Sequence, residues 1–344
     1  MLRTRKGNES AAERPALVTA SVPRGAPVER GKRRIRRILL RSIVALLAVT
    51  VIAALGLYAV VNHLESNIRR IPVTLAAAPQ DNKRLTELLT SSETGPTGVP
   101  AGSANTGTGM IMLLHLNADG RTGGVVSIPP RTVVPVPGHG TTAIQNATVY
   151  GGPSLLVKTV HQLTGVPIDH FARVDLSHLA DLINAVGGVD VTIPTTTTSF
   201  GHKFATGVNH LGGVTALYYA RDPSISEQNR VLRQQNLLRA AINKVVHTRM
   251  LSNPLTTINI LNALTSALTV DSNFTNGELI SLASSLRNVT SNNGTFVTAP
   301  TTVANGAEVL NSAITDQLWS AIDNDSLAAF AGQHPSTVTP TTVP

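Results

Sequence analysis

The sequence contains no cysteine, so disulfide bonds, thiol catalysis and cysteine-ligated metal sites are excluded. Its ten histidines are scattered, and no His-Glu-x-x-His spacing occurs, which disfavours a zinc site. A Gly-x-Ser-x-Gly elbow, a Walker loop and an internal repeat are also missing from the sequence. The familiar catalytic signatures therefore do not identify a function.

Charge is scarce, at 14% of residues, and it is unevenly placed. Residues 1–41 hold twelve of the 28 Lys and Arg residues and three of the 20 Asp and Glu residues, a net charge of +9. The rest of the chain holds 16 basic and 17 acidic side chains, a net charge of −1. The net charge of +8 therefore belongs to the first segment, and we expect no nucleic-acid partner for the remainder.

Residues 1–41 are basic and poor in large apolar side chains, which predicts a disordered tail. Residues 42–61 carry no charge, and their length is about that of a helix crossing a membrane. A cleaved signal peptide is an alternative, because Ala54-Leu55-Gly56 could imitate a cleavage site. The positive-inside rule favours a single-pass membrane protein with a cytoplasmic N-terminus and an extracytoplasmic main domain.

The remaining chain predicts one layered domain with flexible flanks. Residues 62–109 read as a stalk and a flexible loop. The stalk covers about 62–79, Asp81–Leu89 could form a short helix, and the Gly/Ser/Thr-rich loop covers 90–109. From 110 to 330, apolar strand-length runs alternate with helical patterns, which indicates an α/β fold with a mixed central sheet flanked by helices. Residues 331–344 end in a Thr/Pro-rich stretch and predict a disordered tail.

A cluster of arginines stands out in the charge-poor domain. A helix is expected from Glu227 onward with Ser226 as its N-cap, and it places Arg230, Arg233 and Gln234 on one face. Arg221 lies on the loop before it. Guanidinium groups one turn apart suit a phosphate or pyrophosphate. A solvated amphipathic helix is the alternative interpretation.

The region from about Ile111 to Val246 resembles the LytR–CpsA–Psr family. The stretches that carry the resemblance are Ser127-Ile128-Pro129, Val134-Pro135-Val136-Pro137-Gly138-His139-Gly140, Tyr150-Gly151-Gly152-Pro153, Gln162 to His170, Ala185 to Val191 and Arg230-Val231-Leu232-Arg233-Gln234-Gln235.

This resemblance implies an extracytoplasmic phosphotransferase that moves a glycopolymer from a polyprenyl-pyrophosphate carrier onto peptidoglycan, usually with Mg²⁺. It implies an apolar cavity for the lipid, membrane lipid as a further partner, and pyrophosphate binding by Arg221, Arg230, Arg233 and Gln234. Catalytic roles fall to Arg131 and Glu227.

Several positions depart from the family pattern. The family's Arg-Ser-Asp-Thr run is Gly107-Thr108-Gly109-Met110 here, and its Ser-Ile-Pro-Arg-Asp loop is Ser127-Ile128-Pro129-Pro130-Arg131. Lost carboxylates put Mg²⁺ in doubt and leave no metal ligand to name.

Three hypotheses stay open: an active ligase with a rearranged site, a non-catalytic relative that binds polyprenyl phosphates or assists active paralogues, and a membrane-bound transcription regulator. The third is weakest, because the basic segment has no helix-turn-helix pattern.

Overall fold

A computed structural model of the full chain describes residues 68–75, 84–92, 109–247, 254–288 and 294–343. The chain divides into two units, residues 1–58 and 59–344, and every described residue belongs to the second. The basic tail and the expected membrane helix at 42–61 lie outside the described residues. Within the described part, no helix has the length and apolar character needed to cross a membrane.

A seven-stranded mixed sheet forms the centre of the domain, in the order β1-β12-β7-β2-β3-β4-β13. Its pairs β1–β12, β2–β7 and β4–β13 are parallel, and the other three are antiparallel. The strands are β1 (Arg69–Ile71), β2 (Leu85–Ser91), β3 (Ile111–Leu116), β4 (Gly123–Ser127), β7 (His170–Val174), β12 (Leu268–Asp271) and β13 (Gly294–Thr298).

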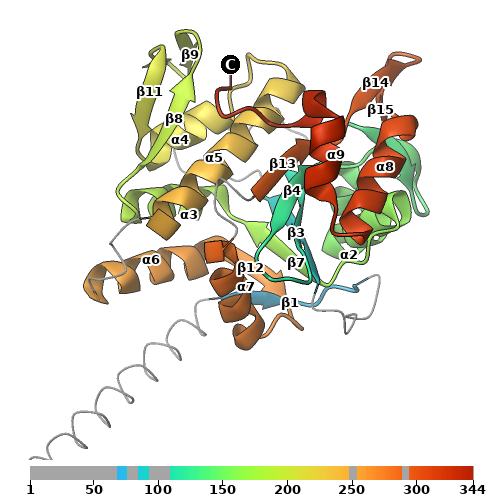
Figure 1. Cartoon of the computed structure of the whole chain (residues 1–344), viewed down its shortest axis with the longest axis horizontal. Coiled ribbons are helices and arrows are strands. Elements are labelled where there is room, and N and C mark those ends of the chain that lie inside the picture. Colours follow the sequence, from blue (N-terminus) through green and yellow to red (C-terminus); the bar gives the residue numbers. More distant parts are fainter. Residues whose placement is uncertain (1–67, 76–83, 93–108, 248–253, 289–293, 344) are drawn as a thin grey trace, which may run out of the picture. The chain divides into compact units, whose positions relative to one another are not determined.

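Both faces of this sheet are covered, which explains the apolar run Ile111–Leu114 at the start of β3. Ile111 and Leu113 point into one cluster, while Met112 and Leu114 point into another on the opposite face. The first cluster is completed by α2 (Asn146–Thr164), α8 (Ser312–Asp323) and α9 (Leu327–Gln333) (Figure 1). The second is closed in part by α5 (Glu227–His247) and α7 (Asn276–Asn288).

A smaller layer packs beside α5 around a third apolar cluster. It contains the antiparallel pair β8–β11 and the helix that follows Gly212, α4. The elements of this layer are α3 (Leu176–Ala185), β8 (Val189–Ile193), β9 (Thr197–Ser199), β10 (His202–Phe204), β11 (Gly207–Leu211), α4 (Gly213–Ala220) and α6 (Pro254–Ala267).

Two peripheral hairpins, β5–β6 and β14–β15, complete the described fold. Their strands, with the last short helix, are β5 (Val133–Val136), β6 (Gly140–Ala143), β14 (Thr301–Ala304), β15 (Ala307–Leu310) and η2 (Pro335–Thr337). Helix α2 begins at Asn146, before Pro153, and is kinked where Gly151 and Gly152 leave helical geometry.

Two expectations from the sequence are corrected here. The stretch predicted as stalk contributes β1 and the central strand β2, so Leu85–Leu89 is strand and not helix. The last described residues are also placed, although their composition predicts disorder: Val343 is fully buried and Val338 bridges to Val297 of β13. In both cases distant side chains satisfy polar groups that the local sequence leaves open.

Candidate functional site

Helix α5 carries most of the predicted site residues. The hydroxyl of Ser226 accepts a hydrogen bond from the backbone N–H of Asn229 at 3.2 Å, so Ser226 is the helix cap that the sequence predicts. The first turn then presents Glu227 and Arg230, three residues apart. Helix geometry alone brings these two side chains together.

Glu227 joins two arginines that come from different elements. Its Oε2 accepts a hydrogen bond from Arg230 and lies 3.6 Å from Nε of Arg131. Arg131 follows β4 in a tight turn, in which the backbone N–H of Thr132 donates to Pro129. The side chain of Arg131 is 62% exposed, against 22% for Arg230 and 13% for Glu227. We call Arg131, Glu227 and Arg230 the arginine cluster. Its two guanidinium groups are accessible to an anion arriving from solvent.

Arg233 is buried in an ion pair, whereas the sequence predicts that it binds pyrophosphate together with Arg230. Its side chain is 1% exposed, and NH1 donates to Oδ2 of Asp222 at 3.0 Å and to the carbonyl of Tyr219 at 3.3 Å. The guanidinium also lies over the Tyr219 ring, 5.0 Å from its centroid. We therefore assign Arg233 to holding α5 against the end of α4, and not to the solvent-facing pair.

The other two predicted binding residues, Arg221 and Gln234, make contacts of their own. Arg221 is half-buried at the end of α4, where its backbone N–H donates to the carbonyl of Leu217. The amide of Gln234 donates to the carbonyl of Gly109 at 3.4 Å, just before β3 begins. Gln234 thus lies at the end of the sheet from which the loop of Arg131 leaves, because Met112 pairs with Ser127.

Sequence reasoning missed Gln235 and Ser127 as a structural link. Nε2 of Gln235 donates to Oγ of Ser127 at 2.5 Å and to the carbonyl of Val297 at 2.8 Å. Gln235 is fully buried, so its partners are set by the fold. The repeated Gln-Gln after Arg233 is the signal that could have directed attention to it.

The described residues around this cluster do not by themselves fit a Mg²⁺ ion. Magnesium in phosphate-transfer sites is usually held by one or two carboxylates together with the substrate. Here the carboxylate of Glu227 already faces two guanidinium groups. Among the residues that the structure describes, no three His, Asp or Glu side chains are grouped to hold a metal.

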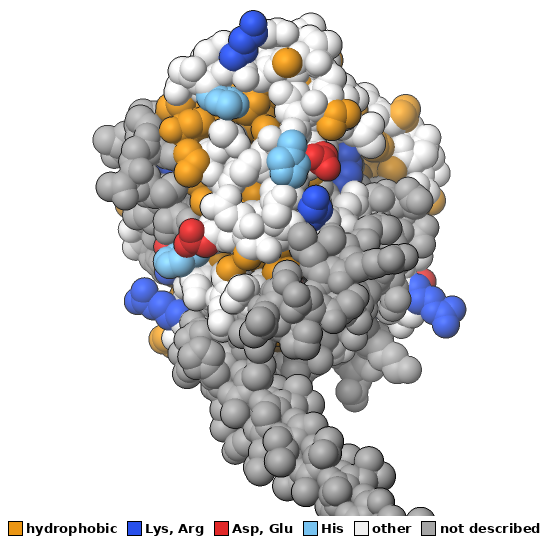
Figure 2. Space-filling model, turned by 90° about the vertical axis from the view of Figure 1, so that its left-hand side faces the viewer, with side chains coloured by type: hydrophobic (Ala, Val, Ile, Leu, Met, Phe, Trp, Pro, Cys, Tyr) orange, Lys and Arg blue, Asp and Glu red, His pale blue; other side chains and the backbone are white. Residues whose placement is uncertain are grey.

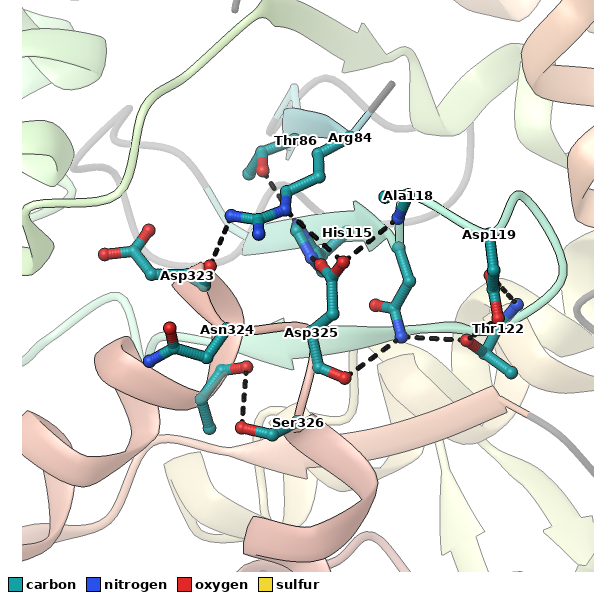
Figure 3. A network of polar contacts seen from close by, with 12 residues as sticks. Arg84, Thr86, His115, Ala118, Asp119, Thr122, Asp323, Asn324, Asp325 and Ser326 are labelled. Atoms are coloured by element: carbon teal, nitrogen blue, oxygen red, sulfur yellow. Dashed lines mark hydrogen bonds and ion pairs between the residues drawn. The ribbon is translucent and has the colours of Figure 1, made fainter. Parts of the chain in front are cut away.

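A second polar cluster lies at the opposite end of the β3–β4 hairpin (Figure 3). Asp325 lies between Arg84 and His115, with its Oδ2 3.3 Å from Arg84 Nε and its Oδ1 3.1 Å from His115 Nε2. The other ring nitrogen of His115 lies 2.9 Å from the Thr86 hydroxyl. Burial lowers the pKa of His115 below its ordinary value, although Asp325 opposes this.

A cavity of about 280 Å³ adjoins that cluster and is lined in part by Arg84, His115, Asp169 and Asp323. Burial raises the pKa of both Asp169 and Asp323 above the ordinary value. The lining thus mixes a guanidinium with carboxylates. This mixture indicates no single class of ligand.

A buried chain of titratable groups crosses β2, β7 and β12. Nδ1 of His170 lies 3.1 Å from Oδ2 of Asp271, and Glu87 is the partner of His170 in the β2–β7 register. Burial raises the pKa of Glu87 to about 7. Burial acts to lower the pKa of His170, but Asp271, Glu278 and Glu87 together raise it above its ordinary value.

The surface of the smaller layer is poor in charge. On the face drawn in Figure 2, basic side chains stand singly among uncharged polar and apolar ones, with acidic groups beside some of them. No continuous basic patch is visible on that face, which agrees with the near-neutral balance of the chain after residue 41.

Known proteins similar to this chain include ones named for cell wall biosynthesis and teichoic acid transfer. The chain is 29% identical over 235 residues to the cell wall biosynthesis protein LcpA of Corynebacterium glutamicum, which covers 59% of this chain and 44% of that protein. It is 30% identical over 201 residues to the teichoic acid transferase TagU of Enterococcus faecalis, covering 57% and 64%. The chain spans about half the length of the corynebacterial relatives.

Solved structures share the fold. A LytR-Csp2A-Psr enzyme from Actinomyces oris superposes with a TM-score of 0.60 at 16% identity, over 74% of this chain and 96% of that one. TagT bound to LIIa-WTA gives a TM-score of 0.58 at 21% identity, over 74% and 99%. Residues 61–327 match the LytR_cpsA_psr family, so the chain belongs to the LytR–CpsA–Psr family.

Proposed function

We propose that this protein acts in cell-wall assembly by binding polyprenyl-pyrophosphate-linked glycopolymers and supporting their attachment to peptidoglycan. The observation that carries the proposal is the convergence of Arg131 and Arg230, from two separate elements, on the carboxylate of Glu227. A pyrophosphate can take hydrogen bonds from both guanidiniums at once. The relatives named for cell-wall biosynthesis and teichoic acid transfer support the choice of polymer class.

The proposed transfer has a defined balance of bonds. A hydroxyl of peptidoglycan attacks the phosphorus next to the glycopolymer, a new P–O bond forms, and the bond to the bridging oxygen of the pyrophosphate breaks. Polyprenyl phosphate leaves with the bridging oxygen, and the hydroxyl proton passes to a base. Arg131 and Arg230 neutralise the charge that grows on the departing phosphate.

Glu227 is the predicted catalytic carboxylate, but its contacts favour a second candidate function. Its carboxylate already accepts a hydrogen bond from Arg230 and faces Arg131, so these contacts occupy it in place of a substrate hydroxyl. A non-catalytic relative that binds polyprenyl phosphates, or that assists active paralogues, accounts for this arrangement. The membrane-bound regulator is the weaker alternative, since the sequence of the basic segment has no helix-turn-helix pattern.

The proposal places the protein at a membrane surface. The uncharged stretch at 42–61 and the basic cluster before it support a single membrane anchor with the described domain on the extracytoplasmic side. That placement puts the arginine cluster in the compartment where lipid-linked polymers meet peptidoglycan. Mg²⁺ is retained as a variable of the experiment, because the family resemblance implies it and the described carboxylates do not fit it.

One experiment tests the proposal. The full chain, purified in detergent, is titrated with farnesyl pyrophosphate and then assayed for transfer of a polyprenyl-pyrophosphate-linked glycopolymer to peptidoglycan, with and without Mg²⁺. Binding that is lost in Arg230→Ala and kept in Arg121→Ala, an exposed arginine in the β3–β4 turn, supports the site. Transfer above a protein-free blank identifies a ligase, and binding without transfer identifies the second candidate. Equal affinity of Arg230→Ala and the unaltered chain would refute the assignment.

A further inference from the structure

The segment Val338–Val343 crosses helix α5 and connects two sheets. Val338 forms a β-bridge with Val297 of β13, and Thr342 forms one with Thr192 of β8. Figure 1 shows this last stretch of the chain, in red, passing α5 towards β8. Thr339 and Val343 are buried, while Pro340, Thr341 and Thr342 between them are exposed. The segment is therefore anchored at both ends and exposed in its middle.

Arg239 of α5 holds the backbone of this segment. Its NH2 donates to the carbonyl of Thr339 at 2.9 Å and its NH1 to the carbonyl of Pro340 at 3.0 Å. The guanidinium lies over the ring of Phe296, 4.4 Å from the centroid. Arg239 is 8% exposed, and a buried cation requires acceptors for its hydrogens. The segment supplies two of them.

Gln235 lies one helical turn before Arg239 on α5, nearer the arginine cluster. It contacts the same segment through the side chain of Thr339. Its Oε1 accepts a hydrogen bond from the hydroxyl of Thr339, while its Nε2 donates to Ser127 and to Val297. The backbone N–H of Thr339 in turn donates to the carbonyl of Phe296 at 2.9 Å. Thr339 is thus joined to both α5 and β13.

These contacts form one path from the segment to the arginine cluster. Ser127 ends β4, and Arg131 follows it by four residues; Gln235 follows Arg230 by five residues on a continuous helix. The amide of Gln235 therefore ties the base of the Arg131 loop to the helix that carries Arg230. The hydroxyl of Thr339 donates to the oxygen of the same amide and so holds its orientation.

We infer that Val338–Val343 is a clamp that sets the position of α5 on the sheet, and that Gln235 and Arg239 are positioning residues for the Arg131–Glu227–Arg230 cluster. The inference rests on the proposed function, in which those two arginines bind pyrophosphate together. When the clamp loosens, Arg230 and Arg131 no longer meet at one anion. The fold persists, because the three apolar clusters do not depend on the hydroxyl of Thr339.

The test uses conservative variants of the full chain in detergent, with farnesyl pyrophosphate as the probe. Thr339→Val keeps the side-chain shape and leaves Oε1 of Gln235 without its donor, and we expect about three- to tenfold weaker binding. Thr339→Ser restores the hydroxyl and should restore the affinity. Thr341→Val, an exposed threonine of the same segment, is the matched control. Arg239→Lys removes the two-pronged contact but keeps the charge, and it should weaken binding to a similar degree.

Thermal melts first give the melting temperature of each variant. All titrations are then made at least 15 °C below the lowest of these, so that weaker binding cannot be caused by unfolding. Thr339→Val with unchanged affinity, in a protein where Arg230→Ala abolishes binding, overturns the clamp and leaves the proposed function standing. Unchanged affinity in Arg230→Ala overturns both. Equal weakening by Thr339→Val and Thr339→Ser also overturns the clamp, because the hydroxyl would then not be the cause.

Discussion

Asp222 and Arg233 meet at 3.0 Å in the interior, each with its side chain 1% exposed. Removal of one partner from a buried ion pair costs about 3–5 kcal/mol, because the other charge stays buried. Arg233→Met should therefore lower the free energy of unfolding by that order, while the double variant with Asp222→Leu should recover much of the loss. Urea unfolding measures both. A single variant as stable as Arg121→Met would contradict the buried pair.

Under the proposed function, Glu227 would compete with a bound pyrophosphate for Arg131 and Arg230, which it already contacts. Glu227→Gln removes that competing charge, so affinity for farnesyl pyrophosphate should rise about three- to tenfold. Titration calorimetry measures the change, with Glu308→Gln on β15 as the control. If Glu227→Gln instead weakens binding as much as Arg230→Ala does, the carboxylate is needed to orient the arginines.

Glu87 should make stability depend on pH. Its pKa rises from 4.5 to about 7 on folding. Below pH 4.5 the carboxyl is neutral in both states; from there to about pH 7 only the unfolded chain ionises, so stability falls as pH rises through this window. Glu87→Gln should therefore have little effect at pH 4 and stabilise the domain by up to about 3 kcal/mol at pH 8.

Melting temperatures at the two pH values check this prediction. Asp316→Asn, an exposed acid on α8, is the control. A Glu87→Gln effect of the same size at both pH values would show that the carboxyl is ionised when buried, held by His170.

Gly213 lies where α4 meets α3 without room for a side chain. A Cβ there would stand 2.1 Å from the carbonyl oxygen of Ala180, whereas a Cβ on the preceding Gly212 would make an ordinary contact at 3.5 Å. Gly213→Ala should cost about 1–3 kcal/mol through overpacking, and Gly212→Ala should stay within about 1 kcal/mol. Thermal unfolding of the two neighbours compares them directly. Equal stability would mean that α3 and α4 separate without cost.

The parts of the fold that follow from local pattern could be predicted. The β3–β4 hairpin and α8 appear where apolar period and turn residues place them. Strand β2 could not, because Thr86, Glu87 and Thr90 interrupt its apolar run. Its polar groups are satisfied from far along the chain: the N–H of Thr86 donates to Asp169 and its hydroxyl meets His115. Such long-range partners leave no trace in a local window.

The site, like the fold, could be predicted only where local sequence spacing determines it. Glu227 and Arg230 follow from helix spacing, and the helix cap Ser226 from its residue type. The burial of Arg233 could not be predicted, because its partner Asp222 lies in the preceding loop and reads as a surface residue. The ordered structure of the Thr/Pro-rich segment could not be predicted either. Arg239 and Gln235 of α5 hold this segment through hydrogen bonds that its own sequence does not indicate.

The strand order has a consequence for how the chain folds. Among the described strands, β1 at one edge of the sheet pairs only with β12, so the partner of Arg69, Thr269, lies 200 positions further along the chain. β13 closes the other edge later still. Non-local pairings of this kind slow folding. Until β12 and β13 have been synthesised, the strands β7 and β4 present open hydrogen-bonding edges. We therefore expect a chain that emerges from its N-terminus to expose these edges before the sheet is complete, and early dilution or a holding chaperone should raise the yield of native protein.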